Sequence, residues 1–249
     1  MAYIPHPDIL RNREILRSRL DMAHQSTRVK TRIRSFLAKQ GLEPPEKFLE
    51  GKLAWLKRQH WQDSRHLVLG VMVDELTALQ ERRAKIDAVL AQLAIDSPDV
   101  KILMSIPGID YYLALMIASE IGDITRFKDR ESFRTYAGCA PKMRQSAGRN
   151  PAKGTNTNGS PRLKTAMSLA AQTAVRFDNP IRDAFLKRYA KTQTKARAHA
   201  VSRRKMCDLV YILLVKGEPC SWANPVSVDR KLHNLVTLND SARRLPTPP

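Results

Sequence analysis

A polar loop between two predicted helices contains a residue type suited to attack on a phosphate. The loop runs from Cys139 to Ser160 and carries Ser146 among four cations, which are Lys142, Arg144, Arg149 and Lys153. A hydroxyl can act as a nucleophile on a phosphodiester, and fixed cations can stabilise the charge that develops on the phosphoryl oxygens. The residues alone leave open whether Ser146 is a nucleophile or an ordinary solvent-exposed serine, because the loop contains no His or carboxylate that could act as its base.

A second candidate is the segment Val100–Leu115, which has the form of a helix-hairpin-helix with the turn Ile106-Pro107-Gly108-Ile109. Gly108 would let the backbone approach a phosphate, and the N-terminus of the second helix would offer free N–H groups. Such a hairpin binds the backbone of a nucleic acid without reading its sequence. A plain helix corner explains the same residues, and Asp110 beside the turn favours that alternative.

Two more cations follow the loop, at the start of the next predicted helix. Ser160-Pro161 is typical of a helix N-terminus, and Arg162 and Lys164 stand in the first turn. Basic side chains are disfavoured at that end by the helix dipole. We therefore interpret Arg162 and Lys164 as nucleic-acid-binding residues.

The elements that must position these residues are all predicted to be helices, and no strand-like alternation appears in the sequence. Shorter helices are expected over 99–105, 110–121, 129–137, 161–176, 180–191 and 195–216, each with a Pro, Gly or capping residue at one end. Two long helices are expected over 8–40 and 64–95, separated by the helix-breaking segment Gly41-Leu42-Glu43-Pro44-Pro45.

The second long helix carries a repeat that predicts packing along one face. The expected seam consists of Val68, Met72, Glu75, Leu79, Arg82, Ile86, Val89 and Leu93, with two polar interruptions. A long helix packed on an unrelated core explains the same pattern. We predict an all-α fold with a long antiparallel, coiled-coil-like helical pair over 1–97, a compact helical domain with a helix-hairpin-helix over 98–220 and a largely irregular tail over 221–249.

The distribution of charge indicates a polyanionic partner. The chain has 249 residues and a formal net charge of +19. Residues 126–205 hold 20 Lys and Arg against 4 Asp and Glu, a net of +16, whereas residues 61–125 are net acidic. A localised field of this kind is suited to bind the phosphates of a nucleic acid. A solvated basic surface without a ligand is the alternative.

Other functional classes find little support in the sequence. The three cysteines, Cys139, Cys207 and Cys220, form no CxxC pair, so neither a disulfide framework nor a zinc site is predicted. No apolar run has the length of a membrane span, and the N-terminus does not resemble a signal peptide. We expect a cytoplasmic, soluble protein that forms a homo-oligomer and does not bind a membrane.

Five motifs in succession resemble a known family. They are SIPGI, EIGDITRF, YAGCAPKMRQSAGR, GSPRLKTAMSLAA and AVSRRKMCDLVYILLVKGEPC, and their order is similar to the C-terminal transposase domain of the bridge-RNA-guided insertion-sequence transposases and of the related Piv-type DNA invertases. Residues 3–37 resemble the coiled-coil segment of that family. The resemblance covers roughly 3–220.

The resemblance implies a chemistry and a set of partners. In the family, the serine of an S-G-G motif forms a phosphoserine link to DNA, assisted by a metal-binding carboxylate cluster in an N-terminal nuclease-like domain. Here that serine is Ser146, and the motif reads Ser146-Ala147-Gly148. DNA and a structured guide RNA are the implied partners. We expect the carboxylate domain to lie outside this chain, on a separate polypeptide, and Mg²⁺ to be bound only with that domain.

We therefore predict a truncated or split transposase or DNA recombinase subunit that binds DNA and guide RNA and carries Ser146 as its nucleophile. Without a carboxylate domain the chain is expected to be inactive. The alternative is a nucleic-acid-binding module without catalysis, either a transposase remnant or an architectural protein. A purely structural helical protein would not explain the basic segment.

Overall fold

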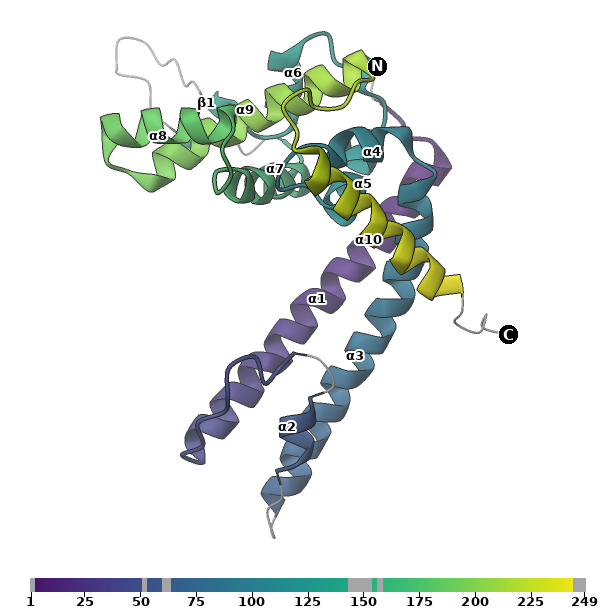
Figure 1. Ribbon diagram of the computed structural model, residues 1–249, viewed down its shortest axis with the longest axis vertical. Helices are drawn as coiled ribbons and strands as arrows, with labels where there is room; N and C mark the ends of the chain where they lie inside the picture. The colour runs from purple at the N-terminus through teal and green to yellow at the C-terminus, as the bar shows by residue number, and fades with distance from the viewer. Residues whose placement is uncertain (1–2, 51–52, 60–63, 143–153, 156–158, 244–249) are drawn as a thin grey trace. The chain divides into compact units, whose positions relative to one another are not determined.

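The computed structural model describes residues 3–50, 53–59, 64–142, 154–155 and 159–243, and over these residues the fold is all-α, as predicted (Figure 1). The elements are α1 (Pro7–Lys39), α2 (Ala54–Lys57), α3 (Ser64–Ile95), α4 (Pro98–Met104), α5 (Tyr111–Ile121), the 3-10 helix η1 (Ile124–Arg126), α6 (Arg130–Tyr136), β1 (Pro141–Lys142), β2 (Gly154–Thr155), α7 (Pro161–Ala174), α8 (Pro180–Thr192), α9 (Lys195–Lys216) and α10 (Pro225–Arg243). Every helix expected from the sequence is present, with its ends within two residues of the predicted ones. The two-residue strands β1 and β2 pair antiparallel.

The chain divides into two compact units, one made of residues 14–89 and the other of residues 1–13 and 90–249. In the first unit α1 and α3 run antiparallel, because three contacts pair rising residue numbers in α1 with falling numbers in α3. Arg19 Nε lies 2.9 Å from Asp87 Oδ1, Arg32 Nη1 lies 3.4 Å from Glu75 Oε2, and just beyond the end of α1 Gln40 Oε1 accepts a hydrogen bond from Arg65. The core between them contains Ile33, Leu37 and Leu76, closed by Leu53 and Leu56 from the connection.

The seam predicted for α3 is wrong in register. Of its eight residues only Met72 and Leu79 are buried, and Val68 and Val89 remain 47% and 50% exposed. For most of the helix the buried face lies one residue later, at Leu69, Leu76, Asp87, Leu90 and Ala94. The buried face includes Asp87, whose carboxylate is bound by Arg19 and Arg83. Because a search for apolar repeats does not expect an aspartate on a buried face, it selects the neighbouring row of residues instead.

The second unit is built around α5, α7 and α9. Nine of the eleven residues of α5 are buried. On α7 the buried residues are mostly small, including Ala166, Ala170 and Ala174, which allows neighbouring helices to approach closely. The predicted cap at Ser160 is confirmed, and the side chains of Asp110, Asp129 and Asn179 likewise accept a hydrogen bond from the first turn of their helix.

The prediction of a largely irregular tail is wrong, because α10 occupies most of it. Asn224 precedes Pro225 and accepts a hydrogen bond from Ser227 N, so this proline begins a helix. Leu235 and Asn239 of α10 are buried, and Lys231 reaches the end of α4. No helix in the described part of the chain is long and apolar enough to span a membrane.

Candidate nucleic-acid interface

Backbone contacts join the two ends of the predicted serine loop. We call these ends the loop neck, made of Tyr136–Lys142 on one side and of Gly154–Thr155 and Gly159–Ser160 on the other. Ser160 N donates a 2.8 Å hydrogen bond to Tyr136 O, and Pro141 and Lys142 pair with Thr155 and Gly154. Gly159 packs so closely that a Cβ there would lie 2.4 Å from Gly138 N. The neck therefore needs glycine at this position.

The predicted residues of the loop itself lie mostly outside the described residues. Ser146, Arg144, Arg149 and Lys153 belong to the segments that the structure does not describe, and for Lys142 it gives only the backbone pairing with Gly154. Their assignment stays a prediction. What the structure adds is the surroundings of the neck from which this segment departs.

A buried carboxylate fixes one side of the neck. Glu120, at the end of α5, accepts a 3.0 Å hydrogen bond from Ser160 Oγ through its Oε2. Its backbone carbonyl accepts hydrogen bonds from Arg13 Nη2 at 3.0 Å and from Tyr136 Oη at 3.2 Å. Glu120 is only 7% exposed. These contacts connect α1, α5, the neck and the first turn of α7.

Three cations lie beside the neck. Arg162 is exposed in the first turn of α7, and Lys164 is half-buried two residues later. Arg203 of α9 donates a 3.3 Å hydrogen bond to Ser168 Oγ, one turn further along α7. Sequence reasoning missed Arg203, although the run Arg203-Arg204-Lys205 was a signal, because only the packing of α9 on α7 brings it here.

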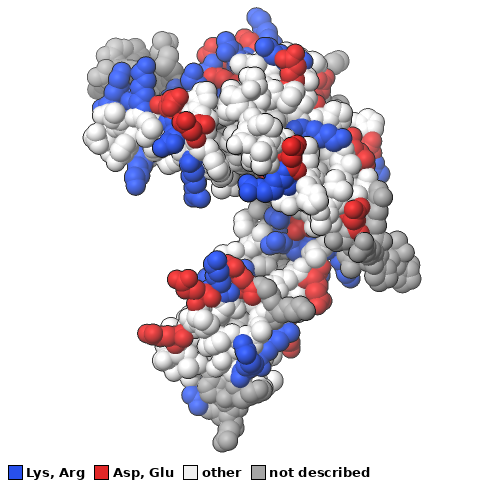
Figure 2. Space-filling model, in the orientation of Figure 1, with Lys and Arg blue, Asp and Glu red and all other residues white. Residues whose placement is uncertain are grey.

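The antiparallel helices α8 and α9 pack on each other and carry a further cationic surface. Figure 2 shows Lys and Arg side chains gathered over this pair of helices. The exposed ones are Lys187, Arg188, Lys191, Lys195, Arg197 and Lys205. Within the described part of the chain, none of them forms an ion pair with a carboxylate. This surface is therefore available for phosphates, and we call it the α8–α9 basic surface.

Not every cation of the basic segment is available. The guanidinium of Arg126 stands 4.2 to 4.3 Å from the ring centres of Tyr3, Phe127 and Tyr136 and donates to Ile121 O. Arg134 pairs with Asp208 at 3.0 Å. Both hold α-helices together, so the basic segment contains structural cations as well as candidate ligand-binding ones.

In the described structure, other parts of the protein contact the segment predicted to be a helix-hairpin-helix. Gly108 has φ +89°, and a Cβ there would lie 2.7 Å from Ala170 O of α7. Asp110 Oδ1 accepts from Leu113 N at 2.8 Å and so caps α5. Lys231 Nζ donates to Met104 O and Ile106 O at 2.6 and 2.9 Å. The role of Gly108 at a phosphate stays a prediction, since the close approach observed is to α7.

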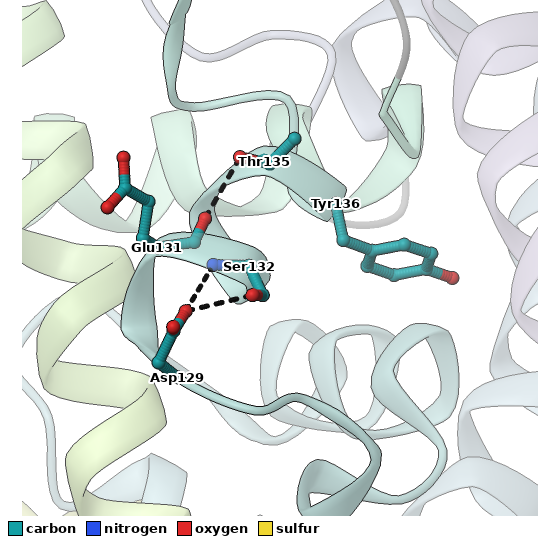
Figure 3. A pocket seen from close by; sticks show the side chains of 5 residues that line it. All are labelled: Asp129, Glu131, Ser132, Thr135 and Tyr136. Atoms are coloured by element: carbon teal, nitrogen blue, oxygen red, sulfur yellow. Dashed lines mark hydrogen bonds between the residues drawn. The ribbon is translucent and has the colours of Figure 1, made fainter.

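A hollow beside α6 does not suit a polyanion. It is lined by Asp129, Glu131, Ser132, Thr135 and Tyr136 (Figure 3). Asp129 Oδ1 accepts hydrogen bonds of 2.8 Å from Ser132 N and Oγ, and these bonds lower the pKa of the Asp129 carboxyl. Two carboxylates with no Lys or Arg in the lining would repel a phosphate.

The described residues also offer no place for the implied magnesium ion. No group of three or more His, Cys, Asp or Glu side chains among them could hold a metal. The side chains of Glu120 and Asp208 are used in a hydrogen bond to Ser160 and an ion pair with Arg134. No step of the chemistry can be assigned to a metal held by these residues.

Comparison with known proteins finds a family match over the segment that contains the neck. Residues 100–187 match the profile described as "Transposase IS116/IS110/IS902 family". The chain is similar to an uncharacterized 43.6 kDa protein of insertion element IS110 from Streptomyces coelicolor, with 26% identity over 66% of this chain and 40% of the relative. It is also similar to a 44.8 kDa protein of insertion element IS116 from Streptomyces clavuligerus, with 26% identity over 63% of this chain and 39% of the relative.

A third relative is named as a transposase, the transposase for insertion sequence element IS1111A of Coxiella burnetii, with 24% identity over 63% of this chain and 41% of the relative. The chain thus spans about two fifths of the length of these relatives. The transposase part of the resemblance is confirmed, while the guide RNA, the Piv-type relation and a domain outside the chain stay predictions. Residues 100–187 are therefore similar to the transposase domain of the IS116/IS110/IS902 family.

Proposed function

We propose that this chain is a subunit of a DNA transposase in which Ser146 is the nucleophile for strand cleavage and transfer. The observation that carries the proposal is the family match over 100–187, which includes Ser146, the loop neck and most of α8. The α8–α9 basic surface supports it, because a protein that handles DNA strands must bind phosphates independently of sequence.

In the proposed reaction Ser146 Oγ loses its proton and attacks a DNA phosphorus atom. A phosphoserine ester forms, and the bond to one deoxyribose oxygen breaks, so that oxygen leaves with the electron pair and takes up a proton. Attack by a hydroxyl of a second DNA strand reverses the chemistry and releases Ser146. Arg144 and Arg149 stabilise the charge on the phosphoryl oxygens, and Lys142, Lys153, Arg162 and Lys164 bind the neighbouring phosphates.

The proposal includes partners that this chain does not supply. A carboxylate domain would hold Mg²⁺, and the metal would supply Lewis-acid chemistry that lowers the pKa of a hydroxyl or stabilises a leaving oxygen. A structured guide RNA selects the DNA, and two or more copies of the chain bring two DNA ends together. The reaction takes place in the cytoplasm. The cations of this chain bind and orient the DNA.

The test is formation of a covalent protein–DNA adduct that survives SDS. The chain is mixed with labelled DNA, the carboxylate domain of a matching partner, guide RNA and Mg²⁺. We expect an adduct with the wild type and none with Ser146→Ala. Ser221→Ala, which removes an exposed hydroxyl beyond α9, is the matched control and should retain the adduct. An adduct that persists in Ser146→Ala would assign the nucleophile to another residue. DNA binding without any adduct would favour the non-catalytic module.

A further inference from the structure

Helix packing brings two cysteines together that are 68 positions apart in the sequence. Cys139 N donates a 2.9 Å hydrogen bond to Arg134 O, and the side chain of Arg134 pairs at 3.0 Å with Asp208, the residue after Cys207. One turn further along α9, the Tyr211 ring lies 6.0 Å from that of Phe133 in α6. Between these two contacts the thiols of Cys139 and Cys207 share a hydrogen bond.

Both thiols are buried, so their reaction with an external disulfide requires local opening of the neck, and their electrostatic surroundings differ. Cys207 is fully buried in the middle of α9, and burial, together with its hydrogen bond to Cys139, raises the pKa of the Cys207 thiol well above its usual value. Cys139 lies on the turn that leads into β1. The hydrogen bond from Cys207 has the largest effect and lowers the pKa of the Cys139 thiol. Burial acts in the opposite direction, and the positive charges of Arg203 and Lys164 lower the pKa again. The thiolate, which is the reactive form, is therefore favoured at Cys139.

We propose that Cys139 and Cys207 are a reversible thiol-oxidation site, which forms a disulfide between the loop neck and α9 when the chain meets a low-molecular-weight disulfide. Both cysteines are reduced in the described structure. In cytosolic proteins such bonds are typically transient and redox-sensing rather than structural. Formation of this bond does not depend on the proposed transposase function, and only its use as a control of the serine loop rests on that function.

The disulfide forms in two thiol–disulfide exchange steps. The Cys139 thiolate attacks one sulfur of the small disulfide, the S–S bond of that molecule breaks, and one small thiolate leaves with the electron pair and takes up a proton. Cys207 then loses its proton and attacks the sulfur of Cys139, which releases the second small thiol. The protein thiols are oxidised by two electrons, and the small disulfide is reduced to two thiols.

The bond would tie the neck to α9 by a covalent link. At present α6 is held to α9 by an ion pair and by packing of aromatic rings, and the first side of the neck, which follows α6, is held to α9 by the thiol hydrogen bond. A disulfide removes the opening motions in which these contacts separate. Amide hydrogen exchange of residues 134–142 should therefore become slower in the oxidised chain.

The test uses the full chain, reduced and then treated with oxidised glutathione under native conditions. We expect the intact mass to fall by two hydrogen atoms, a digest to contain a peptide linking Cys139 to Cys207, and dithiothreitol to reverse both. In Cys207→Ser and Cys207→Ala the second step is blocked, so Cys139 should retain one glutathione. Cys220→Ser is the matched control, because Cys220 is also buried but its N–H is bound to Ser105 at the end of α4.

The proposal is overturned if the native wild type keeps three free thiols under conditions that oxidise a small dithiol. It is also overturned if the linked peptide contains Cys220, or if the Cys220→Ser variant no longer forms the bond. Two different substitutions of Cys207 are used so that the test does not depend on the folding of a single variant. The mass measurement on the wild type requires no substitution. If the disulfide forms but the separate assay gives no DNA adduct, the thiol-oxidation proposal is supported and the transposase proposal is rejected.

Discussion

Ser160 Oγ donates a 3.0 Å hydrogen bond to Glu120 Oε2, so a carboxylate from α5 lies at the N-terminus of α7. The first turn of α7 has no acidic residue of its own and carries Arg162 and Lys164 instead. Helix N-termini favour negative charge. The tertiary structure thus supplies the acid that the sequence of α7 lacks, and it does so at the point where the neck joins the helix.

We predict that Glu120→Ala lowers the free energy of unfolding by about 1–3 kcal/mol, because it leaves the half-buried Ser160 hydroxyl without its acceptor and removes the carboxylate from the helix end. Glu120→Gln keeps an acceptor of the same shape and should cost less. Urea unfolding followed by circular dichroism measures both. Glu131→Ala, at an exposed position of α6, is the control and should stay within about 0.5 kcal/mol of the wild type. A Glu120→Ala variant as stable as the control would contradict this role.

The sequence predicted the helices well because their ends are encoded locally. Asn179 before Pro180 accepts from the N–H groups of Ile181 and Arg182, and Gly217 ends α9 in the left-handed conformation. Each of these signals needs only a few neighbouring residues. The same reasoning does not predict α10, because the prolines of the tail favour an irregular segment, although Val228, Leu232 and Leu235 recur at helical spacing.

The sequence contains no comparable local signal for the contacts between helices that are far apart along the chain. Arg13 binds the carbonyls of Ser119 and Glu120, Lys231 binds those of Met104 and Ile106, and Cys139 meets Cys207. Each of these contacts joins residues far apart in sequence, and the types of the residues do not specify the partner. The candidate site was therefore predictable as a basic serine loop, while the residues that hold its neck were not.

Gly108→Ala is expected to destabilise the protein rather than to weaken nucleic-acid binding alone. A Cβ would lie within 3 Å of backbone atoms of Ala170 and Ala174, and φ is +89°. Gly217→Ala is a matched control, with φ +69° and open space around the added Cβ. Positive φ costs the control roughly 1 kcal/mol, and the packing conflict should add about 1–3 kcal/mol for Gly108→Ala. Equal losses in urea unfolding would show that α7 adapts to the methyl group.

Nucleic-acid binding should depend steeply on salt and should depend on the α8–α9 basic surface. The double variant Lys187→Ala and Lys191→Ala removes two exposed cations from one face of α8. If each binds one phosphate, the slope of log affinity against log salt falls by about 0.9 per contact on duplex DNA. The measurement is a titration between 50 and 200 mM salt.

Arg28→Ala with Arg34→Ala removes the same charge from exposed positions of α1 and serves as the control. Its slope should match that of the wild type. The same reduction in slope for both double variants would show a general effect of net charge instead of a binding surface. A wild-type affinity that does not change with salt would reject the electrostatic interpretation altogether.

The stability contributed by Lys231 should increase as the pH rises. The pKa of the Lys231 ammonium is lowered to about 8, mainly by burial and to a smaller extent by the charge of Arg230, while Asp110 and Cys220 act in the opposite direction. Its usual value is 10.5. Between these two values the unfolded chain holds a proton that the folded chain has released, so the free energy of unfolding rises with pH in this window. The neutral amine still has two N–H groups for Met104 O and Ile106 O.

Urea unfolding of the wild type and of Lys231→Met at several pH values between 7 and 10 tests this. The variant removes both hydrogen bonds, and other titrating groups largely cancel in the difference between the two proteins. We expect the stability advantage of the wild type to be larger at pH 10 than at pH 7, because the cost of burying the ammonium disappears while the bonds to the end of α4 remain. An advantage that stays constant or falls as the pH rises would mean that Lys231 is solvated in the folded chain and does not hold α10 against α4.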